Sequence, residues 1–188
     1  EETGAAASIA KFLAELLGEK FAILGVIFSG AVLVYGGVTT LVVVFSLYPI
    51  ALSLFKKANL PRYLLPGAIA GGCFTFPGTP NLVNVIPTTY LGTNTMAAPL
   101  VGVITGIAVM LMVCVYFLWE ASRARARGDC FVEDEATTQS LVKAASMVRL
   151  PSPIIAILPI VLILILLNVF KQHVVVAMLG GILLCVVL

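Results

Sequence analysis

The chain has 188 residues, of which 61% are apolar and 11% are charged, and its formal net charge is +2. A water-soluble domain carries roughly 25% charged residues, so too little charge is present here to coat a globular surface. The composition excludes a soluble enzyme, gives no reason to expect nucleic acid as a partner, and predicts an integral protein of a lipid bilayer.

The two ends of the sequence predict an internal part of a longer multi-pass protein. The chain opens at Glu1-Glu2-Thr3 without a basic and apolar leader. It stops at 186–188, in the middle of an apolar run. The cysteines form neither a metal-ligand pattern nor a disulfide framework, so we expect no metal site and no cofactor.

Residues 4–20 have the pattern of an amphipathic helix. Their apolar side chains recur at helical spacing, and Lys11, Glu15 and Glu19 occupy the opposite face. Such a helix can lie in the membrane interface or pack against a neighbouring helix, and the sequence leaves both arrangements open.

The run 21–55 carries no charge. It is too long for one span of about 20 residues and too short for two spans with a turn. Because Gly36-Gly37 interrupts it near the middle, we expect a re-entrant hairpin of two half-helices that meet at a glycine-rich tip. The alternative is one long tilted helix with a glycine kink.

A second charge-free region follows the basic residues Lys56, Lys57 and Arg62. Residues 64–96 are predicted to form a helix with an unwound centre, and 97–118 a full spanning helix with Tyr116 and Trp119 as interfacial anchors. Two GxxxG pairs, Gly67/Gly71 and Gly102/Gly106, predict close helix approach in lipid.

Residues 120–150 are the only extended polar segment, and we expect a solvated cytoplasmic loop. A second membrane repeat is predicted to begin at 151–188, after a first repeat that covers 1–119. With a re-entrant hairpin, ten of the 11 basic residues face one side and only Lys171 the other. That bias favours the hairpin and an inner-membrane, multi-pass topology.

Two Gly- and Pro-rich breaks lie inside these charge-free regions, at 35–40 and 77–88. Unwound backbone at membrane depth is costly unless it lines a cavity, and paired broken helices mark binding sites in transporters. Half-helix N-termini suit a carboxylate. We therefore predict a substrate site formed by the glycines, threonines and asparagines of the breaks: Gly36, Gly37, Thr39, Thr40, Gly78, Thr79, Asn81, Asn84 and Thr88.

Several blocks together resemble the gluconate permease family, within a larger ion-transporter superfamily. They are Glu2-Thr3-Gly4-Ala5, Gly18-Glu19-Lys20-Phe21-Ala22, Tyr35-Gly36-Gly37-Val38, Pro77-Gly78-Thr79-Pro80-Asn81 through Ile86-Pro87-Thr88, Tyr90-Leu91-Gly92-Thr93 and Ala97-Ala98-Pro99. The resemblance implies an all-helical inverted-repeat carrier, with Gly36–Thr40 as a hairpin tip and 78–81 as an unwound helix centre.

The resemblance also implies import of gluconate or a related sugar acid or hydroxy acid by cation symport. A proton is the expected coupling ion, with sodium as the alternative, and a homodimer stays open. The regions 21–55 and 63–119 hold no ionisable Asp, Glu, His, Lys or Arg, although proton relays in membranes use such groups. The proton is then carried by a residue elsewhere or by the substrate itself; His173 is a weak candidate in a turn.

Two other classes of function are weighed against a carrier. A channel or structural membrane subunit predicts that the breaks are mere kinks and that no saturable substrate site exists. An intramembrane enzyme lacks support, because the apolar segments hold no Ser/Lys, Asp/Asp or His-rich constellation.

Overall fold

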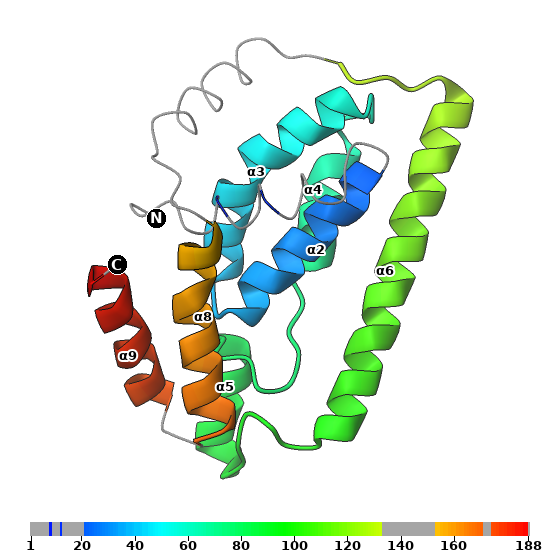
Figure 1. The fold of residues 1–188 in the computed structure, drawn as a ribbon. Helices are drawn as coiled ribbons and strands as arrows, with labels where there is room; N and C mark the ends of the chain where they lie inside the picture. Colours follow the sequence, from blue (N-terminus) through cyan, green and yellow to red (C-terminus); the bar gives the residue numbers. More distant parts are fainter. Residues whose placement is uncertain (1–7, 9–11, 13–20, 133–152, 171–173, 188) are drawn as a thin grey trace.

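The computed structural model describes residues 8, 12, 21–132, 153–170 and 174–187. These residues form helices and no strand (Figure 1). Most of the predicted helix 4–20, residues 133–150 and His173 lie outside this part of the chain. The helices are α2 (Ala22–Tyr35), α3 (Thr40–Lys57), α4 (Leu64–Gly72), α5 (Leu82–Leu91), α6 (Pro99–Arg127), α8 (Pro153–Asn168) and α9 (Val174–Val187).

Helices α2 and α3 form a hairpin, and the turn between them falls at the predicted glycine pair. The N–H of Gly37 donates to the carbonyl of Val34, and that of Val38 to Leu33, at 3.0 and 3.1 Å. This pair of bonds is a Schellman motif, which needs a left-handed residue at its centre. Gly37 supplies it with φ of 89°, so the alternative of one continuous kinked helix over 21–55 is wrong.

Helix α2 is the buried centre of the described structure, and α3, α4 and α6 pack around it (Figure 1). Val26, Ile27, Leu33 and Val34 are fully buried. With 14 residues, α2 is about 21 Å long, less than the roughly 30 Å hydrocarbon core of a bilayer. Its length fits a half-helix, and the re-entrant path of the hairpin stays a prediction.

The crossing of α2 and α4 depends on two glycines. The α-carbon of Gly72 faces Gly30, and a Cβ at Gly72 would overlap the carbonyl of Ile27. Because that carbonyl belongs to helix backbone, it cannot rotate away. Only glycine at position 72 allows the two helices to approach this closely.

The second break is shorter than the sequence predicted. The chain is unwound from Cys73 to Asn81 and then helical from Leu82 to Leu91. The prediction that 82–88 belongs to the break is therefore wrong, because these residues are helical. Asn81 starts this helix: its side-chain oxygen accepts the N–H of Val83 at 3.3 Å, as an N-cap does. Pro87 lies inside α5 and did not prevent it from forming.

Helix α6 extends nine residues beyond the predicted end at Leu118. Residues 120–127, expected to belong to a loop, continue the helix because Ala, Arg and Glu favour helical backbone. The Arg123 guanidinium lies 5.2 Å from the ring centroid of Trp119, and Gly128, with φ of 78°, ends the helix. The solvated, cytoplasmic placement of this region stays a prediction.

The two GxxxG pairs have different partners. Gly67 and Gly71 of α4 lie against Phe117 of α6, which confirms the predicted close approach of two helices. Gly102 and Gly106 of α6 instead face the unwound segment, where Pro77 and Phe76 occupy the space that a Cβ would need. This second pair therefore packs against the unwound segment of a broken helix and not against an intact helix.

Helices α8 and α9 form a second hairpin beside the first (Figure 1). Gly181 of α9 faces Ile163 of α8, and Gly180 faces Leu166. The helices predicted from Pro151 and from Val174 are thus present, with 16 and 14 residues. Their assignment to a second repeat stays a prediction.

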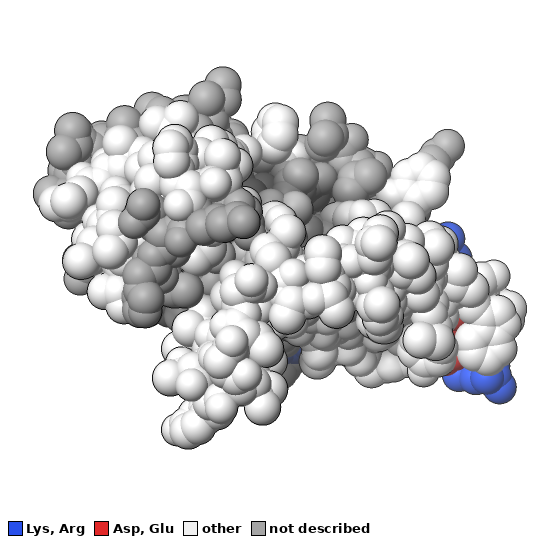
Figure 2. Space-filling view, turned by 90° about the horizontal axis from the view of Figure 1, so that it is seen from below, with Lys and Arg blue, Asp and Glu red and all other residues white. Residues whose placement is uncertain are grey.

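Helices α3 and α6 are long and apolar enough to cross a membrane, judged by length and composition. Only 6% of the most apolar window of α6 is buried, and so much exposed apolar surface is unfavourable in water. Figure 2 shows one face of the molecule on which the charged side chains of the described residues gather mainly at one edge, while most of the other described atoms are uncharged. The described residues have the surface of a membrane protein.

Candidate functional site

The two breaks meet in the structure. The α-carbon of Gly37 faces the ring of Pro80, and a Cβ at Gly37 would lie 2.9 Å from the Pro80 Cγ. The rings of Tyr35 and Phe76 lie edge to face, with their centroids 6.3 Å apart. Residues separated by about 40 positions in the sequence are therefore side by side at the tip of the first hairpin.

A cavity of about 680 Å³ opens beside this junction. Its wall combines the start of α3, the unwound segment, the inner face of α5, the loop before α6 and the first half of α6. The lining residues are Thr40, 73–77, Asn81, Val83, Asn84, Pro87, Thr88, 93–95, Ala97, Gly102, Thr105, Gly106 and Val109.

Four of the predicted site residues line the cavity: Thr40, Asn81, Asn84 and Thr88. They come from three different elements, namely the start of α3, the N-cap of α5 and the body of α5. The prediction that the two breaks contribute to one place is consistent with this geometry.

The other predicted residues lie behind the wall or outside it. Gly36 packs against Ile160 of α8, and Gly37 against Pro80, whereas Thr39 is exposed at the N-cap of α3. Each of these positions shapes the hairpin tip rather than lining the cavity.

Gly78 and Thr79 hold the unwound segment in place from within. The Gly78 N–H donates to the carbonyl of Thr95 at 2.9 Å. The hydroxyl of Thr79, which is fully buried, donates to the carbonyl of Phe76 at 2.7 Å. Both residues therefore satisfy backbone groups that the break leaves without a helical partner.

Asn84 connects α5 back to the unwound segment. Its amide Nδ2 donates to the carbonyl of Phe76 at 2.8 Å, and its Oδ1 accepts the hydroxyl of Thr75 at 3.2 Å. Both atoms of the amide are used, so Asn84 fixes the shape of the cavity.

Asn81 is different, because half of its amide has no partner in the described part of the chain. Its side chain is 6% exposed and lines the cavity. The Oδ1 accepts the N–H of Val83, whereas the Nδ2 donates to no described residue. A buried donor without an acceptor is costly, so a ligand in the cavity would stabilise it.

Two helix N-termini border the cavity. Helix α3 begins at Thr40 and α5 follows Asn81, and both residues are in the wall. The first N–H groups of a helix have no intrahelical acceptor, and the aligned peptide dipoles give this end a partial positive charge. These two helix ends contribute partial positive charge to a wall in which the described residues include no lysine or arginine.

The sequence analysis missed a set of polar lining residues. Thr93, Asn94 and Thr95 form a run of neutral polar residues just before α6, inside a region without charged residues. Their polarity was the available signal. Thr75 and Thr105, which also line the cavity, stand singly among apolar neighbours and gave no such signal.

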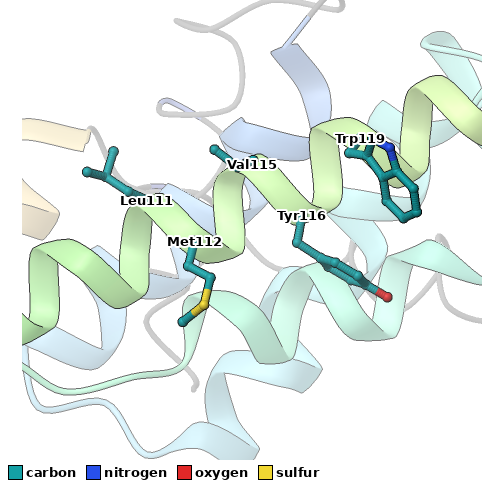
Figure 3. Close-up of a pocket in the computed structure, with 5 residues that line it drawn as sticks. All are labelled: Leu111, Met112, Val115, Tyr116 and Trp119. Carbon is teal, nitrogen blue, oxygen red and sulfur yellow. The ribbon is translucent and has the colours of Figure 1, made fainter.

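A second hollow lies on α6 alone. Figure 3 shows its five side chains along one face of this helix. They are apolar or aromatic and no other element contributes to the wall, so the hollow is the space between neighbouring side chains of an exposed helix. The residues are Leu111, Met112, Val115, Tyr116 and Trp119.

The segment that follows the C-terminal end of α6, far from the cavity, is hydrogen-bonded to the loop between α3 and α4. The Phe131 N–H donates to the side-chain oxygen of Asn59 at 3.1 Å, and the Tyr63 hydroxyl donates to Asp129 at 3.2 Å. Desolvation, this hydrogen bond and the charges of Asp129 and Glu120 raise the pKa of Tyr63, and Arg127 lowers it.

The chain is similar to a protein of Bacillus subtilis (strain 168) called uncharacterized transporter YxjC. The two are 45% identical over 134 residues, which cover 69% of this chain and 28% of the relative. The chain thus spans little more than a quarter of that protein's length. This similarity supports a relationship to transporters and names no substrate.

No family model matches the chain. No solved structure matches it at a significant level.

Proposed function

We propose that this chain forms part of a secondary active carrier that imports a small organic anion by cation symport. The observation that carries the proposal is the convergence of both breaks on one cavity, through the contact of Gly37 with Pro80. In carriers, discontinuous helices meet at the substrate near the middle of the membrane. The similarity to a transporter supports the same class of function.

Two features of the cavity support a negatively charged substrate. The N-termini of α3 and α5 attract a carboxylate, and the buried amide of Asn81 has a donor to offer it. No carboxylate side chain of the described part of the chain lies in the wall to repel an anion. We assign the substrate carboxylate to this end of the cavity.

The remainder of the wall favours a hydroxylated substrate. Threonine and asparagine side chains outnumber other polar groups there, and all of them are neutral. Hydroxyl and amide groups hydrogen-bond to hydroxyls without the cost of burying charge. Gluconate and related sugar acids or hydroxy acids combine a carboxylate with several hydroxyls, so they are the substrates that we propose.

The proposed coupling ion is a proton, with sodium as the alternative. Among the described residues, no Asp, Glu, His, Lys or Arg lines the cavity, so a proton would enter on the substrate or on another residue of the intact protein. A sodium ion would instead use carbonyl and hydroxyl oxygens of the breaks. The inverted repeat, the inner-membrane location and a homodimer belong to this proposal too.

Uptake by the intact protein in liposomes tests the proposal. Labelled gluconate would be supplied under an imposed pH gradient and then under a sodium gradient, with other hydroxy acids as competitors. We expect saturable, gradient-driven uptake, and we expect Asn81→Ala to weaken it more than Thr89→Ala, a change at an exposed position of α5 outside the cavity wall. Flux that rises linearly with solute would favour a channel, and no uptake of any organic anion would favour a structural subunit.

A further inference from the structure

Thr105 is the polar side chain of α6 that faces the cavity. The lining residues of α6 are Gly102, Thr105, Gly106 and Val109, which share one face of the helix at spacings of three and four. Between Pro99 and Tyr116 no other side chain of α6 has a hydroxyl or an amide. The one hydroxyl of this apolar stretch thus lies on its cavity side.

The hydroxyl of Thr105 has no hydrogen-bond partner among the described residues. A threonine within a helix commonly donates to the carbonyl four residues earlier, here that of Val101, but this bond is not formed. The hydroxyl is therefore available to a molecule in the cavity.

The neighbours of Thr105 hold it at a fixed place in the wall. Gly102 seats Pro77 and Gly106 seats Phe76 of the unwound segment, each closer than any side chain would allow. Thr105 lies between these two contacts, about 9 Å along the helix axis from Pro99. The packing of these two rings against the helix backbone sets the position of Thr105 relative to the break.

We infer that Thr105 is a specificity-determining residue, whose hydroxyl binds a hydroxyl of the transported acid. This inference rests on the proposed carrier function and deepens it. The carboxylate lies at the N-termini of α3 and α5, and α6 forms the wall that receives the hydroxylated part of the molecule. Thr105 acts on ground-state binding of the substrate, and its loss changes affinity more than turnover.

The test is the kinetics of gluconate uptake by the intact protein in liposomes. Thr105→Val removes the hydroxyl and keeps the shape, and Thr105→Ser keeps the hydroxyl. We expect Thr105→Val to raise KM about 3- to 10-fold, the range expected for one net hydrogen bond, with the maximal rate per folded protein unchanged. Thr105→Ser should stay close to the wild-type KM.

Thr89→Val is the matched control, because Thr89 lies on α5 outside the cavity wall and is exposed. It should leave KM unchanged. A Thr105→Val variant with the wild-type KM, or a rise in KM that Thr105→Ser shows equally, would overturn this inference alone. Absence of saturable uptake of gluconate and of every competing hydroxy acid by the wild type would overturn the proposed function together with it.

Discussion

Gly37 and Pro80 join the two breaks of the chain by direct contact. Gly37 has φ of 89°, a conformation that favours glycine, and its missing side chain leaves room for the ring of Pro80, 2.9 Å from where a Cβ would lie. Gly37 thus meets two requirements: it adopts the left-handed conformation that ends α2, and it leaves room for the second break to approach. The close approach of the two breaks depends on both conditions being met at the same position.

Gly37→Ala should therefore be far more damaging than Gly36→Ala. The left-handed conformation costs alanine about 1–2 kcal/mol, and the overlap with a rigid proline ring adds to it. Gly36 has φ of −70°, so alanine there adds no backbone strain and meets only the side chain of Ile160. Thermal unfolding in detergent measures both variants.

A double variant separates the two causes. Pro80→Ala should recover part of the stability that Gly37→Ala loses, because it relieves the overlap and leaves the backbone strain. Equal unfolding temperatures for Gly36→Ala and Gly37→Ala would contradict the described turn.

The glycine crossing of α2 and α4 predicts a second contrast. Gly72→Ala should destabilise the protein by about 1–3 kcal/mol, because the added methyl meets the backbone carbonyl of Ile27. Gly67→Ala meets only the ring of Phe117, at 3.0 Å, which can turn aside. Alanine also favours helix by about 1 kcal/mol, so this variant should be neutral or stabilised in the same unfolding assay.

Asn84 should be needed for the shape of the cavity. Asn84→Ala removes the acceptor of the Thr75 hydroxyl and one of the two side-chain donors to the carbonyl of Phe76, which keeps the hydroxyl of Thr79, at a cost of about 0.5–1.5 kcal/mol for each hydrogen bond lost. Asn94→Ala is the matched change, since Asn94 accepts an N–H at an exposed turn where water can replace it. A smaller loss for Asn84→Ala than for Asn94→Ala would show that the break is held by other groups.

The contact of Tyr63 with Asp129 predicts a measurable titration. The fold raises the pKa of Tyr63 above its usual value near 10. The protonated Tyr63 therefore contributes its full stabilisation of the fold below about pH 10, and this contribution disappears as the pH rises through the raised pKa. Asp129→Asn should lower this pKa toward the usual value. Phenolate absorbance, with Tyr63→Phe to identify the residue, follows the change, and an unchanged pKa in Asp129→Asn would refute the contact.

Glycine and charge patterns in the sequence were enough to predict the first break and the helices on either side of it. Gly36-Gly37 interrupts a run that fits neither one span nor two, and glycine is the residue that a helix-ending turn requires. The approach of α4 to α6 followed in the same way from Gly67 and Gly71, because small residues permit close packing.

The rest depended on interactions that residue type alone does not reveal. Pro87 suggested unwound backbone, but the capping side chain of Asn81 begins a helix that tolerates it. The charged residues after Trp119 suggested a loop, but glutamate and arginine favour helical backbone, and α6 continues through them. Thr105 was missed because a single threonine in an apolar helix gains meaning only when Pro77 and Phe76 are seen on either side of it.

Protection of cysteines by substrate tests the central claim, that one cavity between the two breaks binds the transported anion. Thr40→Cys and Thr88→Cys place a thiol on α3 and on α5, in an intact protein whose native cysteines have been replaced. Ser53→Cys, exposed on α3 outside the cavity, is the control. We predict that gluconate, or the hydroxy acid that competes best for uptake, slows labelling of both cavity thiols with the same concentration dependence and leaves the control unchanged. Saturable uptake accompanied by protection of neither cavity thiol, or of only one, would contradict it.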